Sequence, residues 1–162
     1  MDVCGVAEDA ICFLDLPFYE RGRYRQFSLG DTDIELCRQQ LEEFKPHQVY
    51  ATGHIADPSS VQSLCFAAVD RALDKCTDTA WREACRMWLY RGKETALGVD
   101  EIDMAVPMSP DQVSLKTAAI RKFQSISIDE NLSTKPNIDT ADDYDDLGLA
   151  EYEAIEAFER LW

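Results

Sequence analysis

The sequence predicts an α/β domain with a mostly parallel sheet and helices on both faces. Apolar runs of about five residues alternate with longer segments whose apolar residues recur every three or four positions, and these are the periods of buried strands and amphipathic helices. Strands separated by crossover helices form parallel sheets that are covered on both sides. The chain has 162 residues, 46% of them hydrophobic, which is enough for one domain with a core.

The first predicted strand and helix lie in the first 46 residues. Residues 11–16 (ICFLDL) form an apolar run that ends at Pro17 and indicates a buried strand. A helix is predicted from Thr32, which with Glu35 has the S/T-x-x-E form of a capping box, and Pro46 ends it. Its periodic apolar residues are Ile34, Cys37, Leu41 and Phe44.

A second strand and a long helix follow. Gln48–Thr52 (QVYAT) has strand character and ends at Gly53. Asp57 and Pro58 are typical of an N-cap followed by a first-turn proline, and so predict the start of the long helix. Its apolar stripe consists of Val61, Leu64, Cys65, Ala68, Val69, Ala72, Leu73 and Cys76.

Two more strands and a helix complete the pattern. Arg86–Tyr90 (RMWLY) and residues 102–106 (IDMAV) are short apolar runs. Ser109, Pro110 and Gln112 then supply a cap, a first-turn proline and a capping-box partner for the next helix. Its apolar positions are Val113, Ala119 or Ile120, and Phe123.

The chain after this helix is different in composition. Residues 125–141 are polar and contain Pro136, which predicts a loop between the domain of residues 1–124 and the end of the chain. Residues 142–162 are acidic with spaced apolar side chains, which predicts an amphipathic helix that packs on the domain. Residues 129–162 hold 11 of the 31 acidic residues and 2 of the 16 basic ones, so much of the formal net charge of −15 belongs to this tail.

Composition excludes several classes of function. A net charge of −15 disfavours binding to nucleic acids or to anionic membrane surfaces, because both depend on Lys and Arg. The sequence has neither the roughly 18 consecutive apolar residues of a membrane helix nor a secretory signal, so we expect a cytoplasmic protein.

The cysteines predict neither disulfides nor a zinc site. None is arranged as C-x-x-C, and Cys12, Cys37, Cys65 and Cys76 fall on apolar periodic positions, which is typical of small buried hydrophobes. The full set is Cys4, Cys12, Cys37, Cys65, Cys76 and Cys85. The two histidines, His47 and His54, are a thin supply for a metal site.

Candidate binding residues follow the predicted strands. Ligands of parallel sheets bind beyond the carboxyl ends of the strands. His54 and Asp57 follow the second strand and could hold a metal or act as a base with its orienting partner; alternatively, Asp57 is a helix cap and His54 an exposed loop residue. Four arginines could bind an anionic substrate or could be solvated loop charges. They are Arg21, Arg23, Arg25 and Arg91. The sequence contains no phosphate loop, dinucleotide fingerprint, zincin motif or nucleophile elbow.

Five blocks of sequence carry a family resemblance. They are residues 13–20 (FLDLPFYE), 45–51 (KPHQVYA), 88–92 (WLYRG), 104–110 (MAVPMSP) and 147–158 (LGLAEYEAIEAF). In this order and spacing they resemble the C-terminal domain of the long bacterial glucosamine-6-phosphate deaminase-like proteins. That domain belongs to the PIG-L/LmbE-like group of zinc-dependent N-deacetylases, which act on amino sugars. The resemblance implies a Rossmann-like fold.

The resemblance also implies what this chain lacks. The family's His-Pro-Asp-Asp motif follows its first strand, and the chain resembles the family only from beyond that strand, so we expect the first strand and helix to be missing. The family's later H-x-x-H is replaced here, with Ser59 and Gln62 at the two histidine positions. Phe123 stands where the family tends to have another histidine. We therefore expect no metal or cofactor in this chain, although the intact family binds zinc, and the catalytic residues are unknown.

Three hypotheses for function follow. The first is a part of an amino-sugar metabolism protein that is inactive as a deacetylase but binds an anionic or amino sugar through Arg21, Arg23, Arg91, His54 and Asp57. The second is a non-catalytic structural or docking remnant that uses the acidic C-terminal segment. The third is an independent site formed by Asp15, His54 and Asp57. Because the first strand of such sheets is central, we also expect an upstream segment or a second copy to complete the sheet.

Overall fold

The structure is a computed structural model of the chain that describes residues 4–21, 28–53, 60–90, 97–122 and 134–161. It divides the chain into two compact units. We call the first the parallel unit, which comprises Phe13–Tyr90 and Leu161–Trp162. The second is the antiparallel unit, comprising Met1–Cys12 and Arg91–Arg160.

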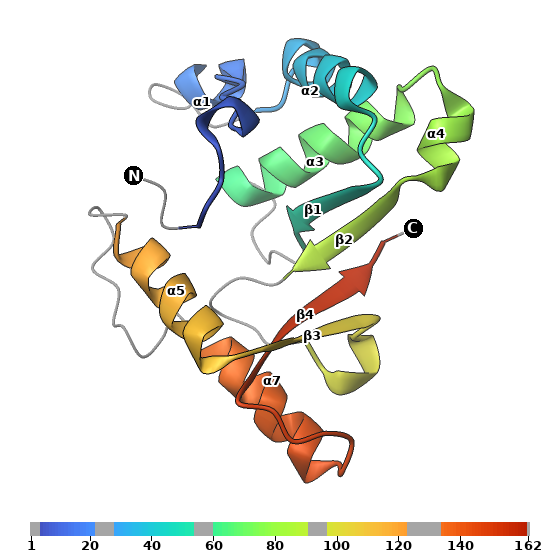
Figure 1. The fold of residues 1–162 in the computed structure, drawn as a ribbon. Helices are drawn as coiled ribbons and strands as arrows, with labels where there is room; N and C mark the ends of the chain where they lie inside the picture. The colour runs from blue at the N-terminus through green and yellow to red at the C-terminus, as the bar shows by residue number, and fades with distance from the viewer. Residues whose placement is uncertain (1–3, 22–27, 54–59, 91–96, 123–133, 162) are drawn as a thin grey trace. The chain divides into compact units, whose positions relative to one another are not determined.

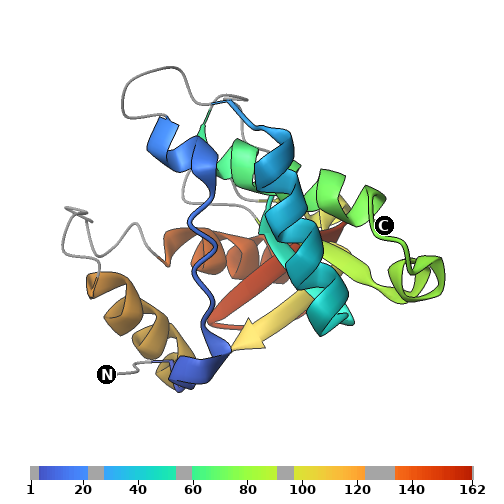
Figure 2. The same ribbon diagram turned by 90° about the horizontal axis from the view of Figure 1, so that it is seen from above.

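The parallel unit is a pair of parallel strands with helices packed beside it (Figure 1). Its elements are α1 (Pro17–Arg21), α2 (Asp31–Phe44), β1 (Gln48–Thr52), α3 (Val61–Asp74), α4 (Thr79–Ala84) and β2 (Arg86–Tyr90). Residues of β1 and β2 pair in register from Gln48 opposite Arg86 to Thr52 opposite Tyr90. Helix α3 packs on β1 and α2 packs on α3, and both helices lie on the same side of the strands (Figures 1 and 2).

Two apolar clusters form the core of this unit. The first joins Ile34 and Cys37 of α2 to Ala68 and Ala72 of α3. Small residues on α3 let the two helices approach closely, and Leu14, Leu16 and Leu29 pack around the same cluster. The second joins α3 to β2 through Leu73, Cys85, Met87 and Leu89. The predicted stripe of the long helix is thus confirmed at its buried positions, which are Ala68, Ala72 and Leu73.

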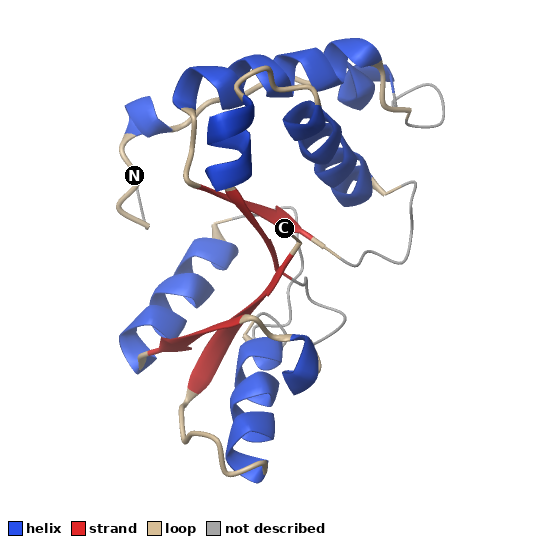
Figure 3. Cartoon of the chain, turned by 90° about the vertical axis from the view of Figure 1, so that its right-hand side faces the viewer, coloured by secondary structure: helices blue, strands red, loops and turns tan. Residues whose placement is uncertain are grey.

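The antiparallel unit contains the other two described strands and two long helices (Figure 3). Its elements are the short 3₁₀-helices η1 (Glu8–Ala10) and η2 (Val99–Glu101), then β3 (Met104–Met108), α5 (Pro110–Arg121), α7 (Lys135–Asp146) and β4 (Ala154–Arg160). Strands β3 and β4 pair antiparallel, with Met104 opposite Phe158 and Met108 opposite Ala154. Helix α7 packs on β4, and Ala154 and Ile155 are fully buried.

A polar cluster ties α5, α7 and β4 together. The Lys116 ammonium donates to the Asn137 amide oxygen at 2.9 Å and to the Glu156 carboxylate at 2.5 Å. The Asn137 amide nitrogen donates to the Ile155 carbonyl at 3.0 Å and to Glu156 at 3.1 Å. Asn137 is 6% exposed, so these bonds satisfy a buried amide.

The prediction of a strand at residues 11–16 is wrong. The segment has no strand assignment, and Phe13 is 83% exposed. Asp15 has φ +44°, which breaks an extended backbone. Leu14 and Leu16 nevertheless pack against the α2–α3 cluster. The apolar side chains of this segment are therefore buried from a loop. An apolar segment forms a strand only where a neighbouring strand pairs with its backbone.

The predictions for the end of the chain are also wrong. Helix α7 begins at Lys135, inside the predicted loop of residues 125–141, because Pro136 occupies its first turn, where a proline costs no hydrogen bond. The predicted helix of residues 142–162 is only the end of α7 followed by β4. Pairing with β3 decided this, as the spacing of the apolar residues suits a helix equally well. The boundary predicted after residue 124 lies outside the described residues.

The sheet and several helix starts differ from the prediction in detail. The described strands form one parallel and one antiparallel pair, so the sheet is mixed rather than mostly parallel. The direction of a strand depends on where the chain re-enters, which periodicity does not encode. The fourth strand is displaced by two residues, and Cys12 is exposed rather than buried. No described helix combines the length and the apolar character needed to cross a membrane.

The caps of α2 and α3 also differ. At the start of α2 the Gly30 N–H donates to the Asp33 Oδ2, so the cap lies at Gly30 and Asp33 rather than at Thr32 and Glu35. Helix α3 begins at Val61 with Ser60 as its N-cap, so the cap predicted at Asp57 is wrong. In contrast, the predicted start of α5 is confirmed, because Gln112 donates its N–H to the Ser109 hydroxyl and accepts from the Ser109 N–H.

Candidate functional site

The carboxyl ends of β1 and β2 lie side by side. Thr52 is opposite Tyr90, and the Gly53 N–H donates to the Tyr90 carbonyl at 3.0 Å, one residue beyond the ladder. The chain continues from Gly53 to His54 and from Tyr90 to Arg91. The parallel register therefore brings together the two points from which the predicted binding segments start, as expected for a binding edge of an α/β sheet.

Gly53 is required by the packing at this edge. A Cβ atom at this position would lie 2.7 Å from the Leu89 Cβ and 2.8 Å from its Cδ1. Leu89 belongs to the buried cluster under α3, so it cannot move away without opening that core. Because Gly53 has no side chain, the backbone at the end of β1 can lie against Leu89 of β2.

The first turn of α3 follows the same edge. The Ser60 hydroxyl accepts from the Ser63 N–H at 3.1 Å and also donates to the Ser63 hydroxyl at 3.0 Å. Gln62 is exposed in this turn. Of the two residues that stand at the histidine positions of the family's H-x-x-H, the structure describes Gln62, whereas Ser59 lies outside the described residues.

Most of the other predicted site residues also lie outside the described residues. These are Arg23, His54, Asp57 and Arg91, together with Arg25. Arg21 is the last residue of α1. Asp15 lies in the loop before α1 and is exposed. The structure therefore describes the frame from which these residues extend, namely α1, Gly53, Tyr90 and the start of α3.

The zinc of the resembled family can be tested only against the described frame. Zinc sites in proteins are built from Cys, His and carboxylate side chains, whereas Gln62 offers an amide. Among the described residues, no three His, Cys, Asp or Glu side chains are grouped so that they could hold a metal ion. We therefore derive no chemical step through a zinc ion.

Sequence reasoning missed a buried carboxylate next to α1. The Asp33 Oδ1 accepts from the Phe18 N–H and its Oδ2 from the Gly30 N–H, both at 2.8 Å. Asp33 and Phe18 are fully buried. The available signal was an acidic residue in the first helical turn, where it can bond back to the N-cap N–H, but Glu35 matched the sequence motif and Asp33 did not.

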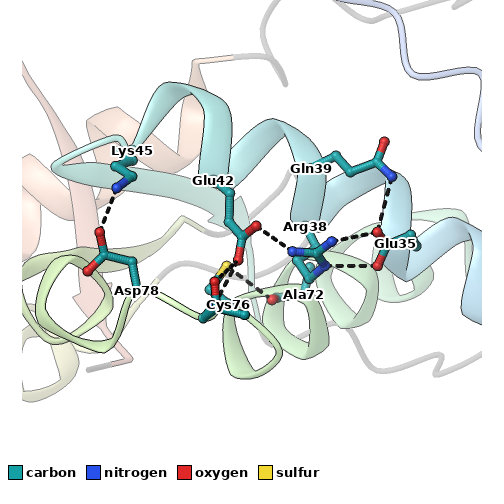
Figure 4. A network of polar contacts seen from close by, with 9 residues as sticks. Glu35, Arg38, Gln39, Glu42, Lys45, Ala72, Cys76 and Asp78 are labelled. Carbon is teal, nitrogen blue, oxygen red and sulfur yellow. Dashed lines mark hydrogen bonds and ion pairs between the residues drawn. The ribbon is translucent and has the colours of Figure 1, made fainter.

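The solvent side of α2 carries a chain of ion pairs (Figure 4). Arg38 lies between Glu35 and Glu42 and is hydrogen-bonded to both. Hydrogen bonds that Arg38 and Gln39 donate to the Glu35 carboxylate lower the pKa of this carboxyl group to about 2. The Thr77 N–H, then Arg38, lower the pKa of Glu42, and the Lys45 ammonium lowers the pKa of Asp78. These contacts join α2 to the connection between α3 and α4 and are structural in character.

A separate cavity of about 570 Å³ lies in the antiparallel unit. Its lining residues are Val99, Asp100, Asp143, Asp146 and Leu147. The carboxylates of Asp100, Asp143 and Asp146 would repel an anionic ligand of the kind that the arginines of the predicted site would bind. Sequence reasoning noted the acidic tail but did not identify the cavity, because Asp100 is distant from α7 in sequence.

Comparison with known proteins gives a relative that matches nearly the whole chain. No protein-family model matches the chain. A glucosamine-6-phosphate deaminase-like protein of Bacteroides thetaiotaomicron is 42% identical over 165 aligned positions, which cover 93% of this chain and 25% of that protein. The chain thus spans about a quarter of the length of this relative and is similar to that part of it.

Proposed function

We propose that the chain is the sugar-binding part of an amino-sugar metabolism protein and that it binds an anionic amino sugar beyond the carboxyl ends of β1 and β2. The observation that carries the proposal is the Gly53–Tyr90 hydrogen bond, since it joins the starting points of the two predicted binding segments. The 42% identity to a glucosamine-6-phosphate deaminase-like protein supports the ligand class.

Each proposed residue has a chemical role in this reading. Arg21, Arg23 and Arg91 bind the anionic group, because guanidinium groups form paired hydrogen bonds with phosphate and carboxylate oxygens. Asp57 accepts hydrogen bonds from the amine or hydroxyl groups of the sugar. His54 contacts a ring hydroxyl, for which neutral imidazole offers both a donor and an acceptor.

The proposed role is binding without zinc-dependent deacetylation. Metal-activated hydrolysis needs a metal held by several protein ligands that also leave a position for water. By the family resemblance, Ser59 and Gln62 replace two functional histidines. The protein is therefore proposed to hold an amino sugar without hydrolysing N-acetyl groups.

A second candidate is a non-catalytic docking role. The connection between α7 and β4 exposes Leu147 (63%), Leu149 (59%) and Tyr152 (46%), and such apolar side chains are typical of contact surfaces when they lie together. In addition, one edge of β1 is paired with β2. An upstream segment or a second copy is proposed to pair with the other edge of β1, as open strand edges readily do.

Titration with glucosamine 6-phosphate, followed by calorimetry and by NMR, tests the binding proposal. Unphosphorylated glucosamine should bind more weakly. Arg91→Gln should weaken the phosphate ester about tenfold or more, since a charged hydrogen bond is worth about 1.5–3 kcal/mol. Arg86→Gln is the matched control. Arg86 is the first residue of β2, the strand that Arg91 follows, and its side chain donates to the carbonyls of Glu83 and Ala84. No binding by the wild-type chain would contradict the proposal.

Two measurements separate the alternatives. Mass spectrometry of metals on the purified protein should find no stoichiometric zinc, and release of acetate from N-acetylglucosamine should not exceed the buffer rate. One zinc per chain together with acetate release would replace the binding proposal by a deacetylase. Absence of sugar binding together with a concentration-dependent dimer, seen by light scattering, would favour the docking role.

A further inference from the structure

The cavity of the antiparallel unit has both acidic and apolar walls. Asp100 comes from η2, and Asp143 and Asp146 come from α7, which packs against η2. Val99 and Leu147 supply the apolar part of the lining. The three carboxylates are exposed, so groups of a binding partner can reach them. The volume of about 570 Å³ lies within the usual range of ligand pockets, about 300–1,000 Å³.

No cation neutralises these carboxylates within the part of the chain that the structure describes. Asp100, Asp143 and Asp146 have no ion pair with a described residue. Lys135, the basic residue of α7, lies at the opposite end of the helix and pairs with Asp139 at 2.5 Å. The last turn of α7 has no basic residue, although the negative end of the helix dipole favours cations there. Local conflicts of this kind are typical of functional sites.

Exposed apolar side chains continue from the cavity along a fixed turn. Leu147 and Leu149 are both mostly exposed. The Gly148 N–H donates to the Asp145 carbonyl at 2.8 Å, and the Leu149 N–H donates to the Tyr144 carbonyl at 2.9 Å. Gly148 has φ +66°, a conformation that glycine adopts without strain. Because these bonds already order the turn, a partner that contacts the two leucines pays little conformational entropy for the backbone.

The sign and the spacing of the charges select the kind of partner. No described group of three ligating side chains could hold one metal ion, so the negative charge suits several separate cations. Nucleic acids and anionic membranes would be repelled, and so would a second copy of the chain, which carries the same net charge of −15. A Lys or Arg side chain fits both walls, because its methylene stem packs on apolar surface while its charged end pairs with a carboxylate.

We propose that this cavity, together with the turn after α7, is a docking surface for a basic peptide segment of another protein in which Lys or Arg residues alternate with apolar ones. The cationic groups of the peptide pair with the three carboxylates, and its apolar side chains contact Leu147 and Leu149. The charge of α7 also attracts such a segment and speeds its association. The inference goes beyond the proposed sugar binding, which involves the parallel unit, and gives the docking candidate a partner of defined chemistry.

Helix α7 provides a matched control for the charges. Asp143→Asn combined with Asp146→Asn removes two carboxylates that line the cavity. Asp142→Asn combined with Asp145→Asn removes two exposed carboxylates of the same helix end that do not line it. Both double variants relieve repulsion at the helix C-terminus, so neither should lower the melting temperature. A loss of binding in the first double variant alone therefore reports on the cavity and not on folding or net charge.

Fluorescence anisotropy with a fluorescein-labelled peptide of alternating lysine and leucine tests the proposal on the full chain. At physiological salt, exposed charges more than about 8 Å apart are largely screened. The double variant of the cavity should bind the peptide about tenfold more weakly, and the control double variant should stay within about threefold of wild type. Leu147→Ser should weaken binding about fivefold or more, whereas Leu115→Ser, at an exposed leucine of α5 outside the cavity lining, should change it less than about twofold.

Three results would overturn the docking surface. One is the absence of peptide binding, and another is equal weakening by the two double variants, which would show a general attraction to negative charge. The third concerns spermidine, which has positive charges but no apolar side chains and should compete at least about tenfold more weakly than the unlabelled peptide. Equal competition would replace the peptide by a free polyamine.

A titration with glucosamine 6-phosphate keeps this inference separate from the proposed function. The double variant of the cavity should respond to the sugar phosphate as wild type does, because the proposed sugar site belongs to the parallel unit. If the wild-type chain binds the peptide but no sugar phosphate, the proposed function fails and the docking surface stands. If it binds the sugar phosphate but not the peptide, the docking surface fails and the proposed function stands.

Discussion

Gly53 and Leu89 approach each other so closely that a Cβ on Gly53 would lie 2.7 Å from the Leu89 Cβ. The contact occurs where β1 ends and where the segment with His54 and Asp57 begins. Because Leu89 is buried under α3, the same contact links the core of the parallel unit to the edge proposed to bind a sugar.

Substituting Gly53 by alanine should destabilise the parallel unit. The added methyl group forces Leu89 or β1 to shift, and overpacking of this kind costs about 1–3 kcal/mol. Urea unfolding monitored by circular dichroism measures the loss. Thr52→Ala, one residue earlier in the same strand, is the control and should cost less. Unfolding of Gly53→Ala at the wild-type urea midpoint would contradict the close approach.

The buried amide of Asn137 should contribute more to stability than an exposed ion pair of α7. Asn137→Ala leaves the Ile155 carbonyl and the Lys116 ammonium each without one partner, and an unsatisfied buried group costs about 1–3 kcal/mol. Lys135→Met removes the ion pair between Lys135 and Asp139, in which the Lys135 side chain is 56% exposed and the Asp139 side chain 42%. This change should cost less than about 1 kcal/mol. Urea unfolding of the two variants compares them. Equal losses would show that the Asn137 cluster has no special role.

The six cysteines should differ widely in reactivity in the folded protein. Burial raises the pKa of the Cys37 thiol to about 11, and burial also raises the pKa of Cys76 and Cys85. Since the thiolate is the reactive form, iodoacetamide at pH 8 should label the exposed Cys4 and Cys12 first. Mass spectrometry of tryptic peptides follows each site. In concentrated urea all six should react alike, and early labelling of Cys37 without urea would contradict its burial.

The Glu35 contact predicts a defined pH dependence. The pKa of Glu35 falls from 4.5 to about 2 on folding, so its contribution to stability is complete above about pH 4.5 and is lost as the pH falls toward 2. The melting temperature of wild type should therefore exceed that of Glu35→Gln at pH 7, and the difference should shrink between pH 4.5 and 2. Glu43→Gln, an exposed glutamate of the same helix, serves as control. A difference that stays constant down to pH 2 would rule out the contact.

Elements with unambiguous local signals could be predicted from the sequence. The bounds of β1 and β2 agree with the prediction, since each is a five-residue apolar run with a helical segment before it. The start of α5 was also predictable, because the side chains of Ser109 and Gln112 each accept a hydrogen bond from the other residue's backbone N–H. Such signals are complete within a few residues and do not depend on the rest of the fold.

The candidate site was predictable only in outline. The positions after β1 and β2 could be proposed as a binding edge once both strands were recognised. Asp33 could not, because its partner Phe18 is 15 residues away and the pairing requires α1 to pack against α2. The acidic cavity was missed for the same reason, as η2 and α7 bring Asp100 and Asp143 together.

The sequence by itself determined the α/β class, the parallel-unit strands and the apolar stripe of α3, because the period of the apolar residues reports which face of an element is buried. Only the tertiary structure decided that residues 11–16 pack as a loop and that Ala154–Arg160 is a strand. An isolated apolar segment can bury its side chains in several ways, and it becomes a strand only when another strand supplies partners for its backbone N–H and carbonyl groups.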